Sequence, residues 1–184
     1  MYNSQQRHQL LQLARDSISS GLKNSKPVPI KVQDFDNELQ QQRACFVTLH
    51  KNNQLRGCIG SLEAQRPLVL DVCENAYSAA FRDPRFNPLQ DEEFNQLTLS
   101  ISVLTPSTAV EFESEQDLLD KIQPGIDGLI LEEGYHRGTF LPSVWEQLPK
   151  PAEFLQHLKI KAGLSANYWS DSIRISRYET ESFE

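Results

Sequence analysis

Cys58 is the residue whose type and setting most favour chemistry. It lies in the run Leu55-Arg56-Gly57-Cys58-Ile59-Gly60, where Arg56 precedes it by two positions, and residues two apart on a strand point to one face. A cation beside a thiol favours the thiolate, which is the form that attacks an electrophile. The pattern predicts Cys58 as a candidate nucleophile, with His50 as a weaker candidate for its base.

The same cysteine also fits a structural role. Free cysteine is among the most buried residue types and packs as a small hydrophobe. Gly57 and Gly60 lie on either side of it, and glycine leaves space or permits bends that a Cβ blocks. The sequence leaves open whether Cys58 reacts, contacts a substrate or packs in a core.

Three arginines follow or accompany this segment and could bind an anion. Arg56, Arg82 and Arg85 carry guanidinium groups, which present a rigid fork to a carboxylate or phosphate. Together with Gly57 and Gly60 they are the candidate substrate-binding residues. The alternative is that they pair with acidic side chains of the chain itself, for which the candidates are Asp71, Asp83, Asp91 and Glu92.

Several other kinds of site lack support. The four histidines are scattered, and no Cys-x-x-Cys, His-x-x-x-His or His-Glu-x-x-His spacing occurs, so no metal is predicted. No Gly-rich phosphate loop is present, and we predict no cofactor. The net charge of -7 disfavours general nucleic-acid binding. The first 92 residues nevertheless hold 11 Lys and Arg against 10 Asp and Glu, so a local basic site there stays open.

The remaining cysteines indicate a cellular setting. Cys45 and Cys73 lie in apolar surroundings typical of core thiols. Three cysteines without a secretory signal favour reduced thiols, so we expect a cytoplasmic protein. No stretch approaches the ~20 apolar residues of a membrane span.

The candidate residues require a hairpin and a helix to position them. Residues 44–50 and 55–60 are two apolar runs separated by a polar turn with two asparagines, which tolerate positive φ. The pattern predicts an antiparallel hairpin with Arg56 and Cys58 on one face. Residues 67–82 carry a stripe of small apolar side chains that predicts a helix packed closely on a sheet.

Further helices and strands follow from periodicity. We expect helices over 4–22, 115–122 and 151–162, the first capped by Ser4 and the second by Ser114. Residues 97–104 alternate apolar and hydroxyl side chains, as a half-buried strand does. Shorter strands are expected at 129–131, 139–141 and 173–178. Helices and strands are mixed without regular βαβ alternation, which favours an α+β fold with a mainly antiparallel sheet flanked by helices.

The order of several segments resembles the AMMECR-domain family, the protein A group of the AmmeMemoRadiSam system. The resemblance covers nearly the whole chain. It rests on residues 46–51, 55–60, 75–76, 79–81, 83–86, 88–89, 101–104, 125–129, 140–142, 144–145, 154–155 and 161–164. It implies one compact, two-lobed AMMECR-like domain over residues 1–184, with the Leu55–Gly60 segment at a cleft. It also implies kinship with proteins that accompany Memo-like and radical SAM proteins.

The resemblance does not supply a reaction, so two functions stay open. The leading hypothesis is an enzyme or enzyme subunit that acts on a small anionic or polar substrate at the cleft holding Arg56 and Cys58. The alternative is a non-catalytic binding or scaffold module for a protein partner, such as a Memo-like or radical SAM protein. Fold-level analogy carries little weight in choosing between them.

Overall fold

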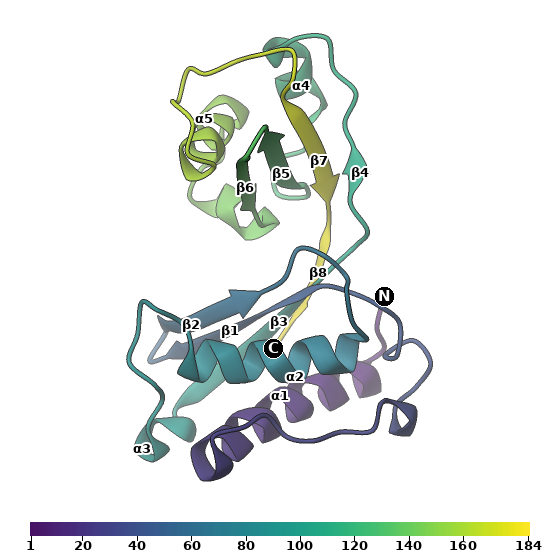
Figure 1. Cartoon of the computed structure of the whole chain (residues 1–184), viewed down its shortest axis with the longest axis vertical. Helices are drawn as coiled ribbons and strands as arrows, with labels where there is room; N and C mark the ends of the chain where they lie inside the picture. The colour runs from purple at the N-terminus through teal and green to yellow at the C-terminus, as the bar shows by residue number, and fades with distance from the viewer. The chain divides into compact units, whose positions relative to one another are not determined.

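The chain forms an α+β fold with two antiparallel sheets, in a computed structural model that describes residues 1–184. It divides into two compact units (Figure 1). The first comprises Met1–Leu104 and Glu181–Glu184, and the second comprises Thr105–Thr180. Each unit holds one four-stranded sheet, where the sequence predicted a single sheet. None of the helices combines the length and apolar composition that crossing a membrane requires.

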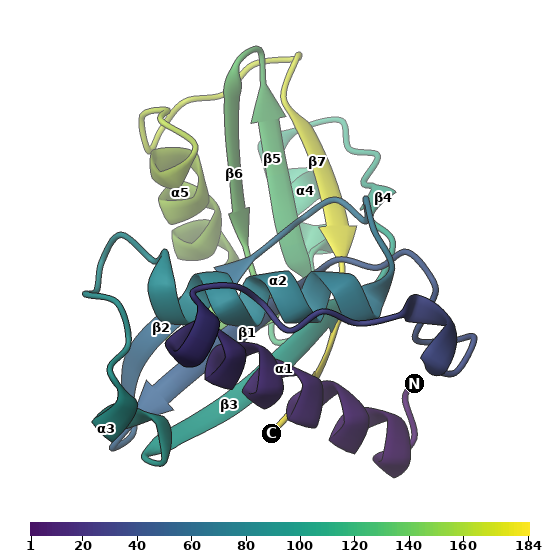
Figure 2. The same ribbon diagram turned by 60° about the horizontal axis from the view of Figure 1, so that its bottom comes forward.

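The first unit contains two long helices and a sheet in the order β2-β1-β3-β8. Its elements are α1 (Ser4–Asn24), η1 (Val32–Asp34), β1 (Cys45–Lys51), β2 (Gln54–Gly60), α2 (Leu68–Phe81), α3 (Asp91–Phe94), β3 (Leu97–Leu104) and β8 (Thr180–Phe183). The last strand returns from the far end of the chain to the outer edge of β3. In Figure 2, α1 and α2 lie side by side along one face of this sheet.

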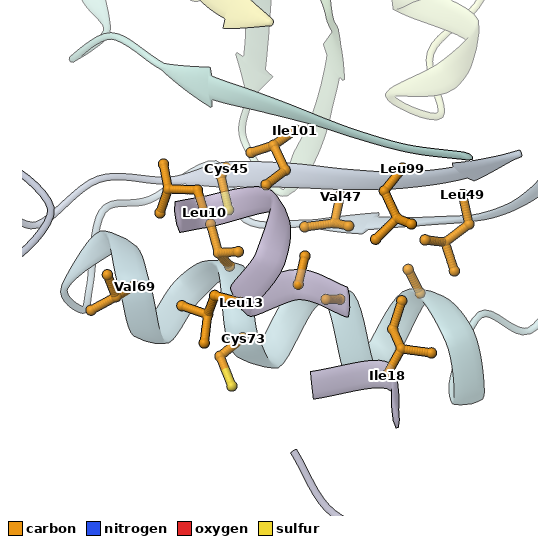
Figure 3. Packing of buried hydrophobic residues seen from close by; sticks show 14 of the residues in the cluster. Leu10, Leu13, Ile18, Cys45, Val47, Leu49, Val69, Cys73, Leu99 and Ile101 are labelled. Atoms are coloured by element: carbon orange, nitrogen blue, oxygen red, sulfur yellow. The ribbon is translucent and has the colours of Figure 1, made fainter. Parts of the chain in front are cut away.

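The core of the first unit fills the layer between these helices and the sheet. Leu10 and Ile18 of α1, Val69 of α2, Val47 of β1 and Ile101 of β3 are all fully buried and converge there (Figure 3). Burying each such side chain stabilises the fold by about 1.5–3 kcal/mol. The small residues of α2 predicted from the sequence let the helix approach the sheet closely.

The predicted hairpin is present as β1 and β2, which pair antiparallel. Asn52 and Asn53 form its turn with φ of 52° and 61°, the left-handed conformation that asparagine tolerates better than most residues. The register shifts between Leu49 and His50. Leu49 lies opposite Gly57 and His50 lies opposite Leu55, so Arg56 is the extra residue of a β-bulge.

Helix ends account for two differences from the expected elements. Asn3, not Ser4, caps α1: its side chain accepts a hydrogen bond from the Gln6 amide, and the Gln6 side chain bonds back to the Asn3 amide. The helix runs past Gly21, whose missing side chain makes room for the Phe81 ring. Ser114 caps the next predicted helix as expected.

The second unit is a smaller sheet in the order β4-β7-β5-β6. Its elements are β4 (Thr108–Ala109), α4 (Glu115–Lys121), β5 (Gly128–Glu133), β6 (His136–Phe140), η2 (Pro142–Glu146), α5 (Pro151–Lys161) and β7 (Arg174–Tyr178). Trp145 stacks on Phe154 in its core, with ring centroids 3.7 Å apart. The sequence did not predict the short strands β4 and β8 or helix α3, which are too short to carry a periodic signal.

Candidate functional site

Cys58 lies on β2, the edge strand of the first sheet, opposite Thr48 of β1. The Thr48 hydroxyl donates a hydrogen bond to the Cys58 sulfur, with Oγ1 and Sγ 3.3 Å apart. Thr48 also lies opposite Ser100 of β3. Residues directly opposite on neighbouring strands share a face, so these three side chains form one polar row across the sheet. Cys58 is a partly exposed residue, whereas the other two cysteines are buried.

The backbone of Cys58 is held from outside the sheet by an ion pair. The Cys58 amide donates to Asp83 Oδ2 at 2.8 Å, and Arg85 Nη2 donates to the Cys58 carbonyl at 3.2 Å. Arg85 and Asp83 are joined by two further hydrogen bonds of 2.9 and 2.7 Å. The Asp83–Arg85 pair thus forms hydrogen bonds with the N–H and the C=O of Cys58, which an edge strand otherwise leaves unpaired.

Electrostatics keep this pair charged. The Asp83 side chain is only 2% exposed. The Arg85 guanidinium holds the pKa of that carboxyl well below its usual range, against the effect of burial. The pKa of Arg85 is raised in turn, chiefly by its hydrogen bonds to Asp83. Arg85 is therefore engaged by a carboxylate of its own chain, the alternative that the sequence left open for it.

Arg56 is similarly engaged, by a carboxylate from α3. Its Nε and Nη2 donate to the two oxygens of Glu93 at 3.0 and 2.9 Å, and Nη2 also donates to the Asn87 carbonyl. Lys51 adds a second cation to Glu93, with Nζ and Oε1 2.9 Å apart. The hydrogen bonds from Arg56 are the main cause that lowers the pKa of Glu93 to about 2, and the one from Lys51 adds to them. Sequence reasoning missed Glu93.

The remaining nitrogen of Arg56, Nη1, is a donor without an acceptor. Nη1 is buried and has no hydrogen-bond partner. A buried donor without an acceptor is destabilising, and native proteins contain few of them. Because Arg56 lies in the bulge, strand alternation no longer fixes which face it takes, and it shares no hydrogen-bond partner with the Cys58 side chain. The predicted common face of Arg56 and Cys58 stays a prediction.

Arg82 lies with a different group of residues. Its guanidinium carbon is 4.9 Å from the centre of the Tyr77 ring, a cation–π distance. The Tyr77 hydroxyl donates to the carbonyl of Ser25, at the end of α1. Arg82 has no ion pair, and its contacts lie on the helical layer. The structure therefore does not bring Arg82 together with Arg56 and Arg85.

The two glycines of the segment are explained by close packing. A Cβ on Gly57 would lie 2.1 Å from the carbonyl oxygen of Ala79 in α2. A Cβ on Gly60 would lie 2.3 Å from the ring of Phe46. The space that each glycine leaves is thus filled by the protein, and neither glycine opens a gap beside Cys58.

His50 lies on β1 opposite Leu55 and Thr98. It is two residues from Thr48, so the two side chains share a face of the strand. Diagonal positions on neighbouring strands lie about 7–8 Å apart, a separation that long side chains can span. No hydrogen bond joins His50 to Cys58. The residue that does contact the sulfur is Thr48, which sequence reasoning missed.

Cys45 and Cys73 are free thiols with structural partners. Burial raises the pKa of both thiols. The Cys45 amide donates to the buried carboxylate of Asp71, which also accepts from Ser61, Arg66 and Asn75. Nowhere does the structure gather three or more His, Cys, Asp or Glu side chains able to hold a metal ion.

Comparison with known proteins identifies relatives over nearly the whole chain. The model of the AMMECR1 family matches residues 11–183. A protein from Methanothermobacter thermautotrophicus is 39% identical over 176 residues, covering 95% of this chain and 91% of the relative. Protein MJ0810 from Methanocaldococcus jannaschii is 37% identical over 179 residues, covering 93% and 86%. The crystal structure of the uncharacterized protein PH0010 from Pyrococcus horikoshii is similar with a TM-score of 0.88 at 35% identity, covering 96% and 89%.

Proposed function

The chain belongs to the AMMECR1 family, and we propose that it is an enzyme or enzyme subunit in which Cys58 is the reacting group. The observation that carries the proposal is the bond from the Thr48 hydroxyl to the Cys58 sulfur. A hydrogen bond donated to a thiolate stabilises the charged form, which is the nucleophile. Cys58 is also the one cysteine that is partly exposed.

The fixed backbone around Cys58 supports the same proposal. A reacting group must be held near its productive position, and the Asp83–Arg85 pair restrains both polar groups of the Cys58 backbone. Hydroxyl side chains continue the polar row at Ser100. These groups suit a small polar substrate that carries an electrophilic carbon.

A charged anionic substrate receives less support. Arg56 and Arg85 each form two hydrogen bonds to a carboxylate of the chain. An incoming anion must compete with these carboxylates, whose negative charge repels it. Arg56 Nη1 is buried, so it offers no exposed donor to an incoming anion either. The substrate class that fits best is therefore polar and uncharged.

Thiol labelling tests this proposal. We expect iodoacetamide to modify Cys58 of the folded protein before Cys45 and Cys73, because only Cys58 is partly exposed. The replacement Thr48→Val removes the hydroxyl at nearly constant volume, and it should slow the labelling of Cys58 at neutral pH. Thr98→Val is the matched control, since Thr98 lies on the neighbouring strand opposite His50. Equal labelling of all three cysteines, or a Thr48→Val labelling rate like that of the control, refutes the role of Cys58.

A second candidate is a binding module for a protein partner, such as a Memo-like or radical SAM protein. Leu55 favours it, because this apolar side chain is 41% exposed at the start of the strand that carries Cys58. Leu55→Ser would then abolish co-purification with such a partner, while Cys58→Ser would leave it intact. An enzyme with a reacting thiol gives the opposite dependence in any assay of turnover.

A further inference from the structure

The second unit contains a cavity that is separate from Cys58. Its volume is about 370 Å³, and it is lined by residues of the 105–108 segment, the turn before β5 and the end of β7. The polar lining residues are Thr105, Thr108, Gln123, Asp127, Arg177 and Glu179. This volume lies at the lower end of the range for small-molecule sites.

Arg177 brings unused hydrogen-bond donors to this cavity. It lies on β7 opposite Thr108 of β4, so these two side chains share a face of the sheet. Its guanidinium makes no hydrogen bond within the chain. The nearest acidic atom is Asp127 Oδ2, 3.9 Å from Nη1, which is beyond hydrogen-bond distance. All five N–H donors of the group are therefore available.

Asp127 brings a fixed negative charge to the same cavity. It is 3% exposed, and its Oδ2 accepts a hydrogen bond of 2.9 Å from the Gln123 amide. Its backbone is fixed as well, because the carbonyl accepts from Trp145 Nε1 at 2.7 Å and the amide donates to Gln123. The second oxygen, Oδ1, has no partner in the chain. A carboxylate held in this way is preorganised for an external donor.

The charges select the kind of ligand. Asp127 and Glu179 repel a simple anion, and Arg177 repels a simple cation. A molecule that carries both charges satisfies both walls, because Arg177 and Asp127 lie 3.9 Å apart without a hydrogen bond between them and each can bond to one end of the ligand. We propose that this cavity binds a small zwitterion, with its carboxylate on Arg177 and Thr108 and its ammonium group on Asp127.

Titration of the ¹⁵N-labelled full chain with β-alanine tests the proposal, with propionate and propylamine as the two half-ligands. We expect saturable shifts of the Thr108, Gln123 and Arg177 signals, and a Kd for β-alanine at least about tenfold lower than for either half-ligand. Arg177→Gln should weaken β-alanine binding by about tenfold or more. Arg174→Gln is the matched control, because Arg174 is an exposed arginine on the same strand and should leave the Kd within about twofold.

Three outcomes overturn the proposal. The first is no saturable shift up to about 50 mM β-alanine, which means that any Kd is weaker than about 50 mM. The second is propionate or propylamine binding as tightly as β-alanine, which assigns the cavity to a simple ion. The third is unchanged binding by Arg177→Gln with a native spectrum. The Arg177 side chain is 41% exposed, so this variant should fold. Cys58 takes no part, so the result is independent of the proposed enzyme site.

Discussion

Glu93→Gln measures how much the negative charge of Glu93 stabilises the Leu55–Gly60 segment. Glu93 accepts hydrogen bonds from Lys51, from two nitrogens of Arg56 and from the Gln90 amide. Its side chain is 17% exposed. The replacement keeps the shape and removes the charge, so it leaves Arg56 largely buried without a counter-ion.

The magnitude follows from proton linkage. The pKa of Glu93 falls from an ordinary 4.5 to about 2 in the folded state. Each pKa unit corresponds to about 1.4 kcal/mol, so the charged form contributes on the order of 3 kcal/mol to stability. Because the folded pKa is the lower one, this contribution is fully present above the unfolded pKa. It is lost as the pH falls from about 4.5 through about 2.

Urea denaturation followed by circular dichroism measures the effect. At neutral pH we expect Glu93→Gln to lower the free energy of unfolding by about 2–3 kcal/mol, slightly less than the full linkage value because the amide oxygen still accepts a hydrogen bond. The difference from the parent protein should shrink as the pH is lowered from 5 to 3. Glu92→Gln is the control: Glu92 is exposed with no ion pair, and its change should stay within about 0.5 kcal/mol. A loss as small as the control's, or one independent of pH, refutes the reasoning.

Three other substitutions test the remaining packing and charge arguments. Glu115→Gln should lower the free energy of unfolding by about 3–5 kcal/mol in urea denaturation, because it leaves the fully buried Lys159 ammonium without its carboxylate. Lys159→Met should be near neutral, since Glu115 is 37% exposed and can be solvated. Equal losses of stability in the two variants contradict this asymmetry. Gly57→Ala should lower the free energy of unfolding by about 1–3 kcal/mol, because the new Cβ would lie 2.1 Å from the Ala79 carbonyl oxygen. A variant as stable as the parent protein would show that α2 shifts away from β2 at no cost. Asp83→Ala should raise the hydrogen-exchange rate of the Cys58 amide by about tenfold or more, because Asp83 is the acceptor for that amide. Amides inside β1 should keep their protection. An unchanged exchange rate at Cys58 contradicts the assigned hydrogen bond.

Much of the fold could be predicted because local patterns and tertiary packing agree. The alternating residues of β3, the two asparagines of the hairpin turn and the small-residue stripe of α2 each give a strong local signal. β8 could not be predicted, because it is a four-residue strand paired with β3 from the distant end of the chain. The α1 cap was misplaced by one residue, since Asn3 and Ser4 are both good caps.

The site was harder to predict than the fold because one residue shifts the register. A two-residue turn at Asn52 and Asn53 with regular pairing places Thr48 opposite Gly57. The bulge at Arg56 moves Thr48 opposite Cys58, and this shift creates the hydroxyl–thiol contact. A bulge depends on how Arg56 is held by Glu93 and Asn87, and those residues lie more than 30 positions away. Sequence periodicity contains no signal for such a contact.

The same long-range contacts change what the arginines of the segment can do. The sequence left open whether Arg56 and Arg85 bind an anionic substrate or pair with acidic side chains of the chain. In the structure each guanidinium is paired with a carboxylate, and the pair at Arg85 reaches Cys58 only through backbone groups. Their net charge near the thiol is therefore small, and their main effect is to fix the edge strand. In the proposed enzyme, activation of Cys58 would depend on Thr48, so the labelling rate of Thr48→Val tests that proposal more directly than any substitution of the arginines.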